Sequence, residues 1–153
     1  MIWRLRLRNN PFDDVIRSVT HPRLADREHL ELVIRQAFDE NFAREASGDG
    51  IWPPLQPATI ADRLRRGFGP GPILVRSGRL RRSWLGGPGS MMTYVQRADG
   101  FRLLVGSGSE IAPWHEFGTH TIPARTVATL DDAQLDAVAR RVEQMIERLA
   151  NAG

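Results

Sequence analysis

Two stretches of this 153-residue chain repeat their apolar residues at helical spacing, and they limit the possible fold more than any other feature. In residues 21–48 the repeating residues are Leu30, Val33, Ile34, Ala37, Phe38 and Phe42; in residues 129–150 they are Leu135, Val138, Val142, Met145, Ile146 and Leu149. Side chains three and four positions apart share one face of a helix, so each stretch predicts a long helix with one apolar side.

Residues that favour helix ends flank both stretches. Thr20 and Pro22 suit the first turn of the first helix, and Gly48 stands where the chain is expected to leave it. Thr129 and Asp132 have the spacing of a capping box, in which side chains bond the free amides of the first turn.

Three other stretches have strand character. Ile2–Arg8 alternates apolar residues with arginines, which is the period of a half-buried strand. Ile73–Leu85 has β-prone character, and Met92–Gly106 contains two apolar-rich runs around Asp99-Gly100. Because an Asp-Gly pair adopts positive φ at little cost, this last stretch predicts an antiparallel hairpin.

The connections between these elements are rich in glycine and proline. Gly48–Pro57 predicts an irregular loop that Trp52 and Leu55 attach to the core, and residues 59–67 predict a short helix with a Thr-Asp capping box and a glycine stop. The order of elements lacks a regular βαβ alternation. The sequence therefore predicts one domain, residues 1–153, of the α+β class: a mostly antiparallel sheet packed with two long helices and joined by glycine-rich loops.

The composition excludes several kinds of chemistry. The chain has no cysteine and no lysine, since all 21 basic residues are arginine. Thiolate nucleophiles, cysteine-based metal sites, a Walker A lysine and a Schiff-base lysine are therefore excluded. No apolar run is long enough for a membrane span, and the first residues lack the apolar region of a secretory signal, so we expect cytoplasmic synthesis and no membrane contact.

A short histidine-rich segment resembles a metal or catalytic site at first sight. His115, Glu116 and His120 lie within six residues of a chain that has four histidines. Zinc sites on a helix need two histidines four apart, whereas five residues leave the two side chains roughly 140° apart around the helix. Pro113 and Gly118 also disfavour a helix, and in a strand the histidines would face opposite sides. The segment therefore predicts no metal site.

The glycine-rich pieces and serines do not form a recognisable catalytic motif either. Residues 67–72, 86–90 and 105–110 lack the Gly-Lys-Ser/Thr sequence that opens a phosphate-binding helix. Ser107 has no glycine two positions after it, as a nucleophile elbow requires. We therefore expect neither an enzyme nor a bound cofactor.

The net charge of +3 is unevenly distributed along the chain. Ile51–Ser109 has a net charge of +7, whereas Asn9–Gly50 has −4 and Glu110–Gly153 has −3. Copies associating head to tail could place the basic middle of one against the acidic helices of the next, and such a contact forms a ring if it closes. The candidate interface residues are Arg76, Arg79, Arg81, Arg82 and Trp84. An ordinary solvated surface is the alternative.

Five pieces of the chain, taken in order, resemble a known family. They are ENFAREASGDGIWPPL (40–55), TIADR (59–63), PILVRSGRLRRSW (72–84), VGSGSEIAPWHEFGT (105–119) and IPAR (122–125). In order and spacing they resemble the phage virion morphogenesis family, to which the G protein of bacteriophage Mu and related tail-completion proteins belong. The resemblance spans most of the chain.

This resemblance implies a non-enzymatic structural protein of a phage or prophage virion. Such a protein completes the tail or joins it to the head in the neck, as a ring of identical subunits. Its partners would be copies of itself and connector, tail-terminator or tail-tube proteins, with non-specific proximity to DNA and no membrane. It would be assembled in the bacterial host cytoplasm and reside in the virion.

The resemblance also suggests a structural role for the histidine-rich segment. We expect a strand-to-turn corner in which Trp114 and Phe117 anchor the core, Gly118 permits the bend and His115 occupies the corner.

Two other functions remain open at this stage. The first is a nucleic-acid-binding module that uses the arginine-rich segment 63–82, since its charge could neutralise several phosphates. This segment has few aromatic residues for stacking and no recognisable reading helix. The second is an enzyme, for which retention of one equivalent of zinc by the purified protein would be the first sign.

Overall fold

The computed structural model describes residues 24–98 and 100–151, and its elements alternate helices with short antiparallel sheets. In chain order these elements are α2 (Leu24–Arg44), β1 (Ala46–Ser47), β2 (Gly50–Ile51), α3 (Pro57–Arg65), α4 (Arg79–Trp84), β3 (Ser90–Arg97), β4 (Gly100–Ser107), α5 (Ala112–Phe117) and α6 (Asp132–Ala150). The predicted α+β class is confirmed. The strand predicted at Ile2–Arg8 and the helix start predicted at Thr20 and Pro22 lie outside the described residues.

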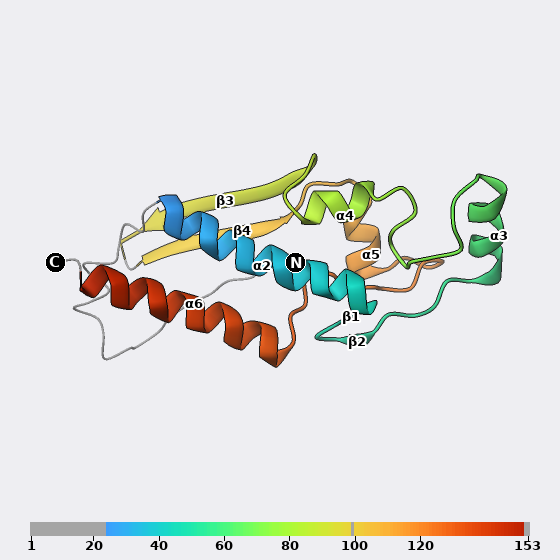
Figure 1. Cartoon of the computed structure of the whole chain (residues 1–153). Helices are drawn as coiled ribbons and strands as arrows, with labels where there is room; N and C mark the ends of the chain where they lie inside the picture. The colour runs from blue at the N-terminus through green and yellow to red at the C-terminus, as the bar shows by residue number, and fades with distance from the viewer. Residues whose placement is uncertain (1–23, 99, 152–153) are drawn as a thin grey trace.

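Helix α2 lies in the middle of an elongated molecule, between the hairpin β3–β4 and helix α6 (Figure 1). Each long helix buries most of the apolar face that its periodicity predicts, although Leu135 of α6 is 37% exposed. The buried apolar residues are Leu30, Ala37, Phe38 and Phe42 on α2, and Val138, Val142 and Met145 on α6. Within the described residues the sheet is smaller than expected, because it consists of two separate two-stranded antiparallel pairs.

Aromatic side chains from distant parts of the chain join the elements around α2. Phe38 meets Trp84 edge to face, with ring centroids 5.1 Å apart, and Phe42 meets Trp52 in the same way at 5.7 Å. The Trp52 indole nitrogen also donates to the carbonyl of Thr126 at 2.9 Å. The prediction that Trp52 attaches its loop to the core is therefore confirmed.

The capping box of α6 lies two residues later than the sequence suggests. Asp131 accepts a bond from the amide of Gln134 (2.9 Å), and the Gln134 side chain accepts one from the amide of Asp131 (3.0 Å). The predicted pair of Thr129 and Asp132 is wrong, since the Thr129 hydroxyl bonds to Asp49 instead.

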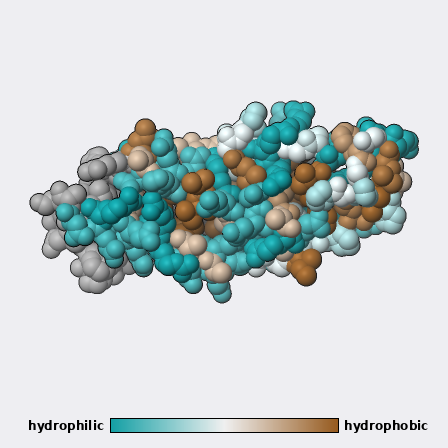
Figure 2. Space-filling model, viewed as in Figure 1, coloured by the Kyte–Doolittle hydropathy of each residue, from teal (hydrophilic) through white to brown (hydrophobic). Residues whose placement is uncertain are grey.

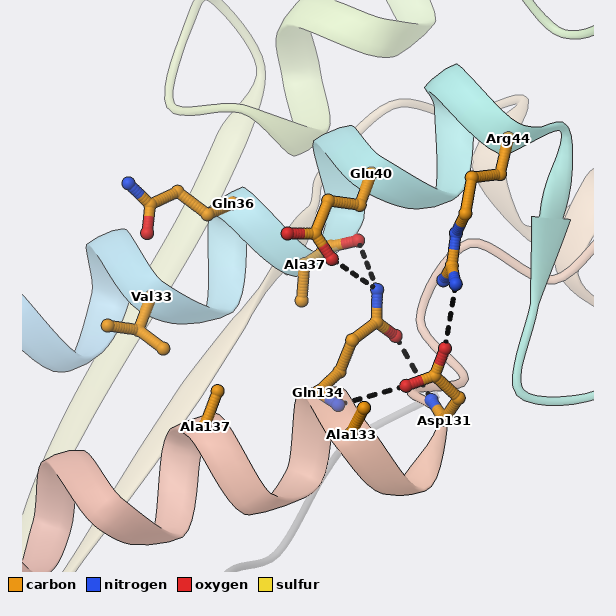
Figure 3. Close-up of a pocket in the computed structure, with 9 residues that line it drawn as sticks. All are labelled: Val33, Gln36, Ala37, Glu40, Arg44, Asp131, Ala133, Gln134 and Ala137. Carbon is orange, nitrogen blue, oxygen red and sulfur yellow. Dashed lines mark hydrogen bonds and ion pairs between the residues drawn. The ribbon is translucent and has the colours of Figure 1, made fainter.

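The same capping residues connect α6 to α2 beside a small depression of ≈ 260 Å³ (Figure 3). Gln134 donates to the carbonyl of Ala37 at 3.1 Å, and Arg44 forms an ion pair with Asp131 at 2.9 Å. The start of α6 is therefore fixed against the second half of α2, and this hollow is part of the helix packing.

The chain leaves α2 earlier than predicted, at Arg44 rather than at Gly48. The next residues form the small hairpin β1–β2 within a region predicted to be irregular. Gly48 lies in its turn, where an added Cβ would be 2.4 Å from the carbonyl oxygen of Leu130. This close approach, rather than a helix end, explains the glycine.

Two predictions for the middle of the chain need correction. Helix α3 starts without a side-chain cap and has Pro57 in its first turn, so the predicted Thr-Asp capping box is wrong, while Gly67 with φ of 78° is the expected stop. The β-prone stretch 73–85 forms helix α4 in its second half, because Leu80 and Trp84 occupy one face and are buried there.

The predicted hairpin is confirmed as β3–β4. Ser90 pairs with Ser107 at one end, and Arg97 pairs with Gly100 at the turn. No helix of the described residues is both long and apolar enough to cross a membrane.

Candidate functional site: an arginine-lined groove

An open groove of ≈ 1140 Å³ lies between α3, α4, α5 and the loops that connect them. Its charged lining consists of five arginines and two acidic residues: Arg63, Arg76, Arg79, Arg82, Arg125, Asp62 and Glu110. Trp114 and His115 line it as well. The groove therefore brings together the arginine cluster and the histidine-rich segment, which the sequence analysis treated as separate features.

Helix α4 directs its side chains in three directions. Leu80 and Trp84 are buried, whereas Arg79 and Arg82 are exposed and line the groove. Arg81 instead forms an ion pair with Asp39 of α2, with an N–O distance of 2.5 Å.

The residues proposed as an interface are thus separated by the fold. Arg76, Arg79 and Arg82 remain available at the groove, and none of them forms an ion pair within the described residues. Trp84 is only 3% exposed and belongs to the core, so its placement on an interaction surface is wrong. The predicted role of the three arginines stays a prediction.

Two further arginines form the buried part of the groove. Arg63 and Arg125 are 6% and 5% exposed. Arg63 donates to the carbonyl of Pro72 at 2.8 Å, and Arg125 donates to the carbonyls of Pro53 and Pro54 at 2.8 and 3.0 Å. These acceptors are uncharged, so the hydrogen bonds position the guanidinium groups without neutralising them.

The arginines also repel one another. Burial and the neighbouring charge of Arg76 lower the pKa of Arg63, while Glu45 opposes this shift. Burial and the charge of Arg63 lower the pKa of Arg125 in turn. A negative group placed in the groove would offset this repulsion, because it would lie close to several positive charges at once.

The segment expected to form a strand-to-turn corner is the short helix α5. Pro113 is tolerated in its first turn, where the amide needs no partner within the helix. Trp114 and Phe117 are 52% and 68% exposed, so their predicted role as core anchors is wrong. The opposite face is buried through Ala112 and Glu116, four residues apart.

Gly118 ends α5 as the sequence suggests. Its φ is 70°, and an added Cβ would lie 2.9 Å from the backbone of Ile122 and Ala124. Only glycine fits this combination of conformation and close approach. The predicted bend is confirmed, although it follows a helix rather than a strand.

The buried carboxyl of Glu116 binds the start of the next segment. Its Oε1 accepts hydrogen bonds from the amides of Val127 (2.5 Å) and Ala128 (3.4 Å). Burial raises the pKa of Glu116, and the two amide bonds only partly oppose this shift. Glu116 is therefore a structural acceptor that holds residues 127–128 against α5.

His115 lies beside Arg125 at the edge of the groove. Its carbonyl accepts the amide of Arg125 at 2.6 Å, and its buried Nδ1 has no hydrogen-bond partner in the described part of the chain. Burial, together with the charge of Arg125, lowers the pKa of His115, so the imidazole is neutral at pH 7. The positive charge of the groove thus comes from arginine.

The described residues, 24–98 and 100–151, contain no group of three or more His, Cys, Asp or Glu placed to hold a metal ion. Comparison with protein-family models, with curated proteins and with solved structures found no match to this chain. The chemical character of the groove therefore rests on its own residues: planar guanidinium groups, which bind carboxylates or phosphates, beside exposed apolar side chains.

Proposed function

We propose that this chain is a structural protein of a phage or prophage virion, which completes the tail or joins it to the head as a homo-oligomeric ring. The proposal gives the chain no catalytic role and no cofactor. The resemblance of its sequence pieces to the phage virion morphogenesis family suggests the setting. The observation that carries the assembly role is the arginine-lined groove next to the exposed aromatic face of α5.

Arginine and large aromatic residues are the types that protein–protein interfaces concentrate. Trp114 and Phe117 on α5 and Ile111 immediately before it are exposed and spaced three residues apart, and Ile111 and Trp114 also line the groove. Exposed large apolar side chains that lie together are typical of an interaction surface. This surface therefore suits a partner with both acidic and apolar side chains.

The end of the molecule beyond the groove has a similar mixed character. Helix α3 projects at this end, and apolar side chains gather there among polar ones (Figures 1 and 2). Leu64 of α3 is 56% exposed, while Arg63 on the same helix is buried and bonded to Pro72. The helix is thus fixed at one point and presents an apolar side chain to a neighbour.

The glycine-rich loops 67–72 and 86–90 are held in defined positions by backbone hydrogen bonds. In the loop 86–90, the amide of Gly87 bonds to the carbonyl of Arg82 (2.8 Å), and the amide of Gly108 bonds to the carbonyl of Gly89 (2.8 Å). In the loop 67–72, the amide of Phe68 bonds to the carbonyl of Arg63 (2.9 Å). The loop 86–90 lines the groove through Pro88 and Gly89, and the loop 67–72 supplies the Pro72 carbonyl that holds Arg63.

A deletion and complementation experiment in the encoding phage or prophage tests this function. Without the chain, we expect electron micrographs to show incomplete tails or unjoined heads and tails. Wild-type chain supplied in trans should restore complete particles, whereas a folded R79E/R82E double variant should not. Complete infectious particles that lack the protein by mass spectrometry would refute the virion role.

A nucleic-acid-binding module is the second candidate, because Arg76, Arg79 and Arg82 are exposed and have no carboxylate partner in the described residues. Filter binding across a salt series tests it, since neutralised phosphates produce a steep loss of affinity with salt. The groove also has apolar lining residues, including Leu55, Leu74 and Ile122, which suit protein side chains better than a phosphate backbone. This lining favours the assembly role.

A further inference from the structure

The outward face of helix α6 has an acidic stripe whose dimensions and charge complement the groove. The stripe consists of Asp132, Asp136, Glu143 and Glu147. At 100° per residue these four positions fall within about 60° of one another, and at 1.5 Å per residue they extend over about 22 Å. All four are exposed, and none forms an ion pair within residues 24–98 and 100–151.

The arginines of α6 leave most of this stripe acidic. Arg141 bonds to His29 and Arg148 bonds to Asp26, both on α2 and away from the stripe. Arg140 alone lies at its edge by helical position. Ala139 lies midway along the stripe and about 20° beyond its Asp132 edge, and because it is exposed and small, another surface can approach the helix closely there.

The groove contains too few acidic residues to balance its five arginines. Asp62 is already bonded to Arg65 and Arg66, which lower the pKa of its carboxyl. Glu110 is then the remaining acidic residue against five arginines. Within the described residues, the exposed arginines of the groove and the acidic residues of the α6 stripe therefore have no ion-pair partner, and the two surfaces are complementary in charge.

The stripe and the groove of one chain cannot meet each other. Helix α6 lies along one half of the elongated molecule, and α3, α4 and α5 lie in the other half (Figure 1). A contact between the two surfaces is thus a contact between two copies. Because it joins different surfaces, it is head to tail and can repeat around a ring.

We propose that the arginine-lined groove of one copy receives the acidic stripe of α6 from a second copy. Arg76, Arg79 and Arg82 meet the carboxylates, the face of α6 around Ala139 approaches the groove, and the exposed Trp114 packs at its edge. This contact deepens the proposed function, on which it rests, by naming the two surfaces that join the subunits. Salt weakens it, because the pairing charges lie at the surface.

The absence of native cysteine allows a direct test with single-cysteine variants of the full chain. Ala139→Cys places a thiol beside the stripe, midway along its length, and Ser77→Cys places one at the groove; both residues are exposed. Docking holds the two thiols at an effective concentration of about 1 mM. In mixtures at about 10 μM, with oxidised glutathione as the two-electron oxidant, the mixed disulfide should therefore form on the order of a hundredfold faster than between undocked thiols. Ala43→Cys mixed with Ser77→Cys is the matched control, because residue 43 is exposed but belongs to neither surface.

Charge reversal then separates a lost contact from a lost fold. D136R/E143R in the A139C chain should abolish the faster cross-linking, and R79E/R82E in the S77C partner should restore it, with far-UV circular dichroism unchanged. Equal rates for the A139C and A43C mixtures would overturn the inference.

The outcomes also separate this inference from the proposed function. Association through other surfaces, seen as cross-links that do not depend on these charges, overturns the contact and leaves the virion role standing. Loss of DNA binding in R79E/R82E without any A139C–S77C cross-link overturns the contact in favour of the nucleic-acid function. Particle assembly in the complementation experiment is scored independently of both results.

Discussion

Replacing Trp84 by alanine tests whether the arginine-rich helix α4 is part of the core or part of an interaction surface. The Trp84 side chain is 3% exposed and meets Phe38 edge to face at 5.1 Å. Its carbonyl also accepts a bond from the buried Arg35 at 2.6 Å. The side chain thus fills the space between α4 and α2.

The expected loss of stability is large. Truncation of a buried aromatic residue to alanine costs about 3–5 kcal/mol, because burial is lost and a cavity remains. A domain of this size has a total stability of roughly 5–15 kcal/mol, and each kcal/mol shifts its Tm by about 2–4 °C. We therefore expect W84A to lower the Tm by roughly 6–20 °C, measured by circular dichroism and checked by urea denaturation.

Two matched variants make the result specific. W84F should cost much less than W84A, because the ring packing is largely kept and the indole Nε1, which is buried without a partner in the described residues, is removed. W114A changes a residue that is 52% exposed, so its stability should stay within about 0.5 kcal/mol of wild type. If W84A were as stable as wild type while W114A unfolded, the assignment of these two tryptophans to core and surface would be wrong.

Three further changes test other parts of the fold. Burial raises the pKa of Glu116 in the folded state, so the folded protein binds this proton more tightly than the unfolded chain does. The free energy of unfolding should therefore fall as pH rises above the unfolded pKa of about 4.3. E116Q should flatten this fall in urea denaturation between pH 4 and 8, and an unchanged slope would contradict the assignment. N41A should lower the free energy of unfolding by more than about 2 kcal/mol, because the buried Asn41 amide donates to the carbonyls of Val127 (2.9 Å) and Thr129 (3.2 Å). Q36A, an exposed change on the same helix, should lower it little. G118A should lose at least about 2 kcal/mol in thermal or urea unfolding, because a Cβ there meets backbone at 2.9 Å in a glycine-only conformation, and G69A, where the nearest contact is 3.4 Å, should be tolerated.

The long elements of this fold could be predicted because their signals repeat many times. Helices α2 and α6 each have five or six turns over which apolar residues recur, and the hairpin β3–β4 has two eight-residue strands around a turn signal. Errors at their ends arose where several residues could cap. At the start of α6, Asp131 rather than Thr129 became the cap, because Thr129 bonds to Asp49 across the chain.

The two six-residue helices could not be predicted in the same way, since they are too short to show a period. In α4 the buried pair is Leu80 and Trp84, whereas in α5 it is Ala112 and Glu116, so that Trp114 faces water. Which face is buried depends on what lies against the helix rather than on residue type. The predictions for the two tryptophans were therefore the opposite of the structure: Trp84 was expected on a surface but is buried, and Trp114 was expected in the core but is exposed.

The groove was predictable only in part for the same reason. The cluster of Arg76, Arg79 and Arg82 is visible in the sequence as a run of positive charge. That His115 and Arg125 line the same groove depends on the path of the chain after β4. In the sequence, Arg125 stands out only as the last residue of the IPAR piece, 122–125. Its role follows from two hydrogen bonds to residues far away in sequence, for which no local pattern exists.

Arg125 shows why the shape and the charge of the groove depend on one another. Its Nε and Nη2 donate to two consecutive carbonyls, those of Pro53 and Pro54, which requires the fixed planar arrangement of a guanidinium group. A lysine lacks this paired geometry, and burial would favour its neutral form, so it would not reliably keep the charge. In this chain, where every basic residue is arginine, the group that holds the loop against the groove is the same group that keeps the groove positive. A change at Arg125 must therefore alter both the geometry and the charge of the groove, whereas Arg79 and Arg82 are exposed and form no ion pair within the described residues, so changes there alter mainly its charge.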